Sequence, residues 1–155
     1  MDVQLVAVVD GARARYFSVG KRLTPRGEEK TQLVEIETLI NPAHRAKDGE
    51  LFSDSRPGLR AAFAGGPGHA VDDRRDAHTD EFDRKFARLV VERMSDLIRD
   101  SDVRHAIIAA GPRMLGHLRE HRELLPRVDI GELPKHLTEL SAHELCLRLE
   151  ADQLL

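Results

Sequence analysis

The stretch VQLVAVVDG, residues 3–11, decides the fold of this chain. Residues 3–9 are almost continuously apolar and rich in β-branched side chains, which is typical of a strand covered on both faces of a sheet. Asp10 and Gly11 follow at once, and an Asp-Gly pair predicts a tight turn because glycine tolerates positive φ. We therefore expect a central strand at 3–9 and a returning strand at residues 13–19.

A third strand is expected at residues 33–39, where apolar and polar residues alternate roughly. Alternation at this period places Glu35 and Glu37 on one face of the strand and Val34 and Ile36 on the other. Three strands joined by short connections predict an antiparallel meander. Because the third strand would be exposed at the margin of this meander, it could pair with a second copy of the chain and form a homodimer.

Three helices are expected in the second half of the chain. The first begins at Thr79, a residue that can cap a helix, and acids follow it at the positive end of the helix dipole. The second begins at Pro112, because proline suits the first turn of a helix. The last begins at Ser141, and its spacing from Glu144 predicts a capping box. The side chains expected to face inward are Phe82, Phe86, Leu89, Val90, Met94, Leu97, Met114, Leu115, Leu118, Leu125, Leu145, Cys146 and Leu149.

Further buried strands are expected at residues 103–110 and 128–130, so the element order is β-β-β-α-β-α-β-α. This order predicts an α/β fold of the ribonuclease H-like type, with a mixed five-stranded sheet and helices on both faces. The chain is long enough for one domain over residues 1–155. Residues 41–78 are rich in proline and glycine and follow neither period, which predicts a long loop.

The composition bounds the classes of function that the chain can have. A formal net charge of −3 argues against a strongly basic nucleic-acid binder but leaves room for a local basic patch. The one cysteine, Cys146, cannot form an intrachain disulfide, which fits a reducing compartment. No stretch is long enough to span a membrane, and no basic region precedes the N-terminal apolar run. We therefore expect a cytoplasmic protein with no membrane partner and no cofactor.

Three stretches resemble a known bacterial family. They are VDGARARYF at residues 9–17, AGPRMLGHLR at residues 110–119 and GELPKHLTELS at residues 131–141. They are similar to the proteins required for attachment to host cells, and LFSDSRPG at residues 51–58, which contains Arg56, looks like the loop motif of that family. The family name implies an interaction factor in cell attachment.

That family is in turn similar to the middle domain of archaeal and eukaryotic release factors, which carries a Gly-Gly-Gln between its third strand and first helix. Gly65 and Gly66 stand at this position here, and Pro67 stands where the glutamine would be. Proline has no backbone donor and cannot position a water as an amide side chain does. The resemblance thus implies a non-catalytic module associated with the ribosome or RNA. The alternative is a peptidyl-tRNA or RNA hydrolase that uses Gly65 and Gly66.

Arg113, Lys135 and His117 are candidate contacts for such a partner. Arg113 follows Pro112 at a helix start beyond a parallel strand, where an anion can bind, and Lys135 can join it. The alternatives are an Arg113 paired with a carboxylate inside the fold and a solvated Lys135. His117 and His121 have the spacing of metal ligands, but no glutamate follows His117, so we expect a solvated surface and no metal.

Asp10, Arg13, Arg15 and Arg56 are weaker candidates. Asp10 stands where ribonuclease H-like nucleases hold a metal-binding acid, but the strand at 103–110 ends without an acid, which favours a turn residue. Arg13 and Arg15 share one face of their strand and form either a basic patch or its solvent side. Arg56 lies among charges of both signs, in a segment that is either disordered or ordered by a partner.

Overall fold

The computed structural model describes residues 3–43 and 68–155, and for residues 68–78 it describes the backbone alone. The expectations for Arg56, Gly65 and Gly66 therefore lie outside the described residues. The elements are β1 (Leu5–Val9), β2 (Arg13–Leu23), β3 (Glu29–Ile40), α3 (Gly68–Asp100), β4 (His105–Ala110), α4 (Pro112–Arg119), a 3₁₀ turn η1 (Arg122–Leu124), β5 (Asp129–Leu133) and α5 (Ala142–Ala151).

The strands form one mixed, open sheet of five strands in the order β3-β2-β1-β4-β5. β1 lies in the middle, antiparallel to β2 and parallel to β4, and β4 is parallel to β5. Every residue of β1 is buried, as its unbroken apolar run predicted. The predicted α/β class and mixed five-stranded sheet are confirmed, and β3 is an edge strand.

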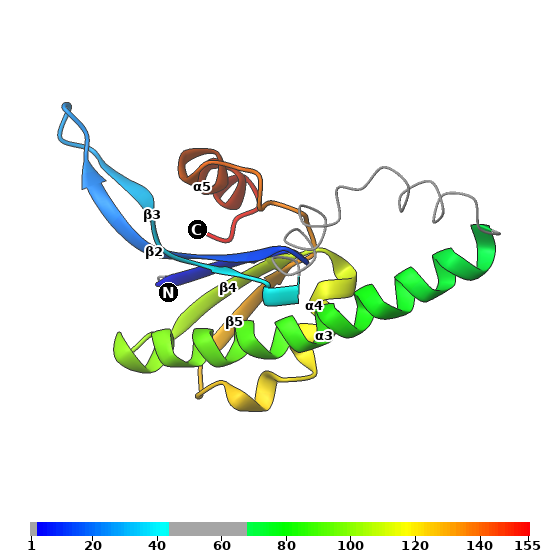
Figure 1. Ribbon diagram of the computed structural model, residues 1–155. Helices are drawn as coiled ribbons and strands as arrows, with labels where there is room; N and C mark the ends of the chain where they lie inside the picture. Colours follow the sequence, from blue (N-terminus) through cyan, green and yellow to red (C-terminus); the bar gives the residue numbers. More distant parts are fainter. Residues whose placement is uncertain (1–2, 44–67) are drawn as a thin grey trace.

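The two faces of the sheet carry separate hydrophobic cores. α3 and α4 cover one face and α5 covers the other (Figure 1), so helices on both faces are confirmed. Neighbouring residues of β2 serve opposite cores, because Tyr16 packs under α3 and Phe17 packs under α5. The Tyr16 hydroxyl donates a hydrogen bond of 2.8 Å to the carbonyl of Val90 on α3. Burial raises the pKa of Tyr16, so it remains a neutral donor that fixes α3 to the sheet.

α3 begins at Gly68 and not at Thr79, so the predicted loop at 41–78 is wrong over its last part. In Figure 1 the first turns of α3 lie beyond the end of the sheet. A helix needs an apolar stripe only where it faces a core, so the lack of a helical period in this part of the sequence does not exclude a helix. Of the predicted inner face, Phe82 and Leu89 are exposed. Phe86, Val90 and Met94 are buried, and Leu97 is half-buried.

β2 and β3 are longer than predicted, and their hairpin projects away from the sheet (Figure 1). Gly27 closes this hairpin with φ +81°, a conformation that favours glycine. A β-bulge interrupts the pairing, because Tyr16 pairs with Glu37 while the next residue, Phe17, pairs with Glu35. The extra residue reverses the alternation, so the prediction that Glu35 and Glu37 share a face is wrong.

Candidate functional site at the carboxyl ends of the central strands

β1 and β4 end side by side, with Val9 paired to Ala110. After β1 the chain turns at Asp10 into the hairpin with β2, and after β4 it enters α4 through Gly111. The connection after β1 thus leads to β2 on one side of the β1–β4 pair, and the connection after β4 leads through α4 to β5 on the other side. In α/β sheets, ligands bind outside the carboxyl ends of parallel strands at such a point. The residues gathered here form the candidate site.

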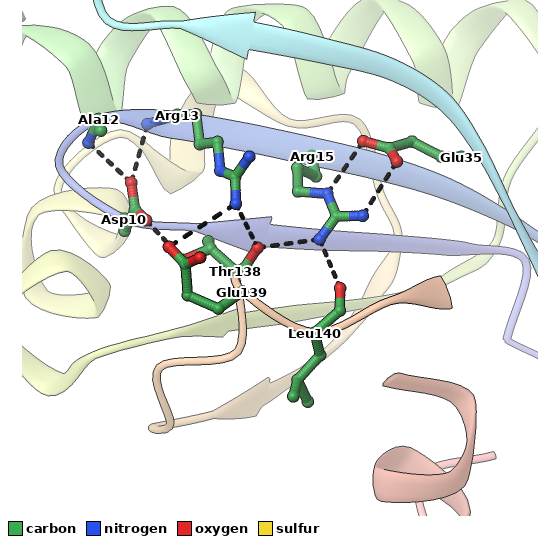
Figure 2. Close-up of polar contacts among 8 residues, drawn as sticks. All are labelled: Asp10, Ala12, Arg13, Arg15, Glu35, Thr138, Glu139 and Leu140. Carbon is green, nitrogen blue, oxygen red and sulfur yellow. Dashed lines mark hydrogen bonds and ion pairs between the residues drawn. The ribbon is translucent and has the colours of Figure 1, made fainter. Parts of the chain in front are cut away.

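Asp10 holds the turn after β1 and joins it to the segment before α5 (Figure 2). Its Oδ1 accepts hydrogen bonds from the backbone amides of Ala12 at 2.7 Å and Arg13 at 2.8 Å. Its Oδ2 accepts a bond of 2.5 Å from the Thr138 hydroxyl. These contacts are those of a turn residue. Within residues 3–43 and the described side chains after residue 78, no group of three or more His, Cys, Asp or Glu residues is placed to hold a metal ion.

Arg13 and Arg15 point from β2 to the same segment (Figure 2). Arg13 Nη2 donates to the carbonyl of Thr138 at 2.7 Å. Arg15 Nη1 donates to the same carbonyl at 2.9 Å and to the carbonyl of Leu140 at 2.6 Å. Only 12% of the Arg15 side chain is exposed, so for this residue both the basic patch and the solvent side are wrong expectations. The two arginines instead fasten the segment before α5 to the sheet.

Glu35 completes the binding of Arg15 through two parallel hydrogen bonds. Arg15 Nε and Nη2 each donate to one oxygen of the Glu35 carboxylate at 3.0 Å. The bond to Arg15 lowers the pKa of Glu35 below its ordinary value, and the Thr38 hydroxyl acts in the same direction. The Arg15 guanidinium also lies 5.0 Å from the centre of the Phe17 ring, within the range of a cation–π interaction. Arg15 is therefore a structural cation with several partners.

Asp80 of α3 lies between two side chains of α4. Its Oδ1 is 3.2 Å from Arg113 Nε and 3.0 Å from His117 Nε2. Its Oδ2 is 3.6 Å from Nη2 of Arg84, one turn later on α3. The hydrogen bond with His117 is the main cause that lowers the pKa of Asp80. Arg113 therefore has the internal carboxylate partner that was the alternative to a bound anion.

His117 is only 6% exposed, so the expectation of a solvated surface is wrong for this residue. The physical reason is the position of α3, which packs against α4 and contributes Asp80 to the imidazole. Arg113, by contrast, keeps 68% of its side chain exposed. The α4 core residues Met114, Leu115 and Leu118 are buried as predicted.

Two glycines allow titratable side chains to approach the strand ends. A Cβ on Gly11 would lie 3.0 Å from Oδ1 of Asp83, and a Cβ on Gly111 would lie 2.2 Å from Cε1 of His136. Burial raises the pKa of Asp83. Neither Asp83 nor His136 was predicted as a site residue from the sequence. The glycine that follows each central strand was the signal that could have found them.

Lys135 pairs with a carboxylate that follows α5 and not with the charged groups around Arg113. Its Nζ is 3.2 Å from both carboxylate oxygens of Asp152, which follows α5. Arg148 of α5 lies 3.6 Å from the same carboxylate. Lys135 thus pairs near the end of α5, whereas Arg113 pairs with α3.

Cys146 is buried on the inner face of α5, where burial raises the pKa of its thiol.

The fold and the site define a small α/β domain with a mixed open sheet, in which Arg113, just beyond a central strand, pairs with Asp80 of α3. A family model described as "Protein required for attachment to host cells" matches residues 5–149, and the chain belongs to this family. The search of curated proteins found no match. Among the helices of the described residues, none combines the length and apolar character that a membrane crossing needs.

Proposed function

We propose that this chain is a non-catalytic binding module that associates with the ribosome or another RNA through the carboxyl ends of its central strands. The observation that carries the proposal is the position of Arg113. Its guanidinium is largely exposed at the start of α4, directly after a parallel strand, where a phosphate can bind. A single well-placed cation is compatible with the net charge of −3, because the net charge is a sum over the whole chain and does not fix the charge at one place.

The contacts of the neighbouring residues support a binding role over a catalytic one. Asp10 uses both carboxylate oxygens to hold its turn and Thr138, so its contacts are structural. Asn41 donates from Nδ2 to the carbonyl of Gly11 at 2.8 Å, which ties the end of β3 to this face. In the sequence, Pro67 follows Gly65 and Gly66 where a release factor has its glutamine. Deletion of these two glycines tests the alternative of a hydrolase.

Co-sedimentation with ribosomes over a series of salt concentrations tests the proposal. Association should weaken as salt rises, and Arg113→Ala should reduce both the affinity and the salt dependence, the latter by about one unit of slope. The matched control is Arg99→Ala, which removes an exposed cation from the far end of α3. Failure to bind at any salt concentration would reject the proposal. Equal losses from both substitutions would reject Arg113 as the specific contact.

The family description favours a second candidate, an interaction factor in cell attachment. Three apolar side chains of the edge strand β3 are exposed: Val34, Ile36 and Ile40. An exposed apolar edge strand is a surface on which another chain can pair. Under this candidate, Val34→Lys should impair attachment of the cells that express the protein and leave ribosome co-sedimentation unchanged. Arg113→Ala should have the opposite pattern, so the two candidates are separable.

A further inference from the structure

Arg113 and His117 hold one carboxylate oxygen in common. They stand one helical turn apart on α4, and Asp80 Oδ1 lies 3.2 Å from the first and 3.0 Å from the second. The carboxylate comes from another element, α3. A guanidinium and an imidazole that converge on one oxygen form the arrangement that recognises a phosphate or a carboxylate. His117 is almost completely buried, whereas the Asp80 side chain is partly exposed, so the hydrogen bond between them is part-buried.

We propose that Arg113 and His117 form a binding site for a phosphate oxyanion, and that Asp80 occupies this site as an intramolecular competitor. The proposal deepens the proposed function, on which it rests for the source of the phosphate, the backbone of RNA. Free inorganic phosphate offers the same chemistry and tests the site without RNA. A ligand that binds here must displace Asp80, so its apparent affinity in the native chain is lowered.

The surrounding charges determine when the site accepts an anion. α3 contributes Asp80, Asp83 and Arg84, and α4 contributes Arg113 and His117. With Asp80 in place, the carboxylates balance the cations and oppose a further negative charge. Without it, Asp83 alone of this group remains acidic, opposite two arginines and an imidazole. Asp10 also acts on Asp83, but its own oxygens are bonded to its turn and to Thr138.

Asp80→Ala removes the carboxylate that occupies the site, and alanine is the residue with the highest helix propensity. We expect this variant to co-sediment with ribosomes at least about five-fold more tightly than the native chain, a typical coupling between two sites. Glu81→Ala is the matched control, because Glu81 is the next residue on α3 and, among the described side chains, pairs with Lys85 one turn later at 3.4 Å. Addition of Arg113→Ala to Asp80→Ala should abolish the gain. Equal gains from Asp80→Ala and Glu81→Ala, or no gain in a folded Asp80→Ala, would overturn the proposal.

A second measurement follows the imidazole of His117 by NMR while inorganic phosphate is added, with chloride at matched ionic strength as the control. Asp80→Ala should respond at lower phosphate concentration than the native chain. If Asp80→Ala does not fold, the native chain itself should respond at high phosphate and not to chloride. No phosphate-specific response in either chain would overturn the site. A phosphate response without any ribosome association would keep the site and reject the proposed function.

Discussion

Glu35 and Glu37 are two positions apart on β3, yet they bind arginines on opposite faces of the sheet. Glu35 binds Arg15 on the face of α5, and Glu37 binds Arg93 of α3 with distances of 2.5 and 2.8 Å. Regular alternation would put both carboxylates on one face, and the bulge between them separates them. The edge strand is thereby fastened to both layers of the fold.

The pair Glu37–Arg93 should contribute a measurable coupling energy to stability. In a double-mutant cycle with alanine at both positions, we expect about 0.5–1 kcal/mol, since the pair is half-exposed but bidentate. The comparison pair is Lys21–Glu29, whose atoms are 3.8 Å apart and whose side chains are both largely exposed. Its coupling should be close to zero. Chemical denaturation measures both cycles, and equal coupling energies would contradict the prediction.

Arg15→Ala should destabilise the fold much more than the loss of a surface cation. The substitution removes the donors to Thr138, Leu140 and Glu35, and two of these acceptors are backbone carbonyls in part-buried positions. We expect a loss of about 2–4 kcal/mol in the free energy of unfolding. Arg22→Ala, at an exposed position of the same strand, is the control and should change stability little. A loss below about 1 kcal/mol for Arg15→Ala would show that solvent replaces these contacts.

Stability should depend on pH through Glu35. Its pKa in the folded chain lies below the ordinary value of 4.5, because Arg15 favours the charged form. The contribution of charged Glu35 to the free energy of unfolding is therefore complete well above pH 4.5. It is lost as the pH falls through the lower pKa of Glu35 in the folded chain. Urea unfolding of the native chain and of Glu35→Gln should differ most near neutral pH and converge in acid. If the difference in the free energy of unfolding between the native chain and Glu35→Gln grew as the pH fell, the predicted direction of the pH dependence would be wrong.

Gly111→Ala should displace the imidazole of His136, because the added Cβ would lie 2.2 Å from Cε1 of that ring. The backbone of Gly111 has φ −60°, so alanine meets no backbone strain there. His136 is exposed and its ring can move, so we expect a cost of about 1 kcal/mol or less. His136→Ala should restore stability in the double variant. If the double variant stays as unstable as Gly111→Ala, another neighbour makes the clash.

The order of the elements could be predicted because each carries a local signal. The apolar run of β1, the turn at Asp10, the proline at the start of α4 and the capping box between Ser141 and Glu144 are all confirmed. The lengths were harder to predict. The β2–β3 hairpin and the first turns of α3 extend past the sheet (Figure 1), where packing imposes no period on the sequence.

The partners of the site residues could not be predicted from local patterns. That Arg13 and Arg15 share a face was foreseeable, but the carbonyl of Thr138, which accepts from both, lies far along the chain. The burial of His117 depends on how α3 crosses α4, and alternation along one strand cannot reveal the bulge after Glu35. Such contacts arise from tertiary packing and not from propensity.

The central position of β1 has a consequence for the order of folding. Leu5 pairs with Ser18 on one side, a near neighbour in the chain, and with Ala106 on the other. The meander of the first three strands can close early, whereas β1 must wait for β4 until a long stretch of chain has been synthesised and brought back. Contacts of such sequence separation slow folding. During that interval, the edge of β1 that β4 later covers is a vulnerable surface for misassociation of the nascent protein.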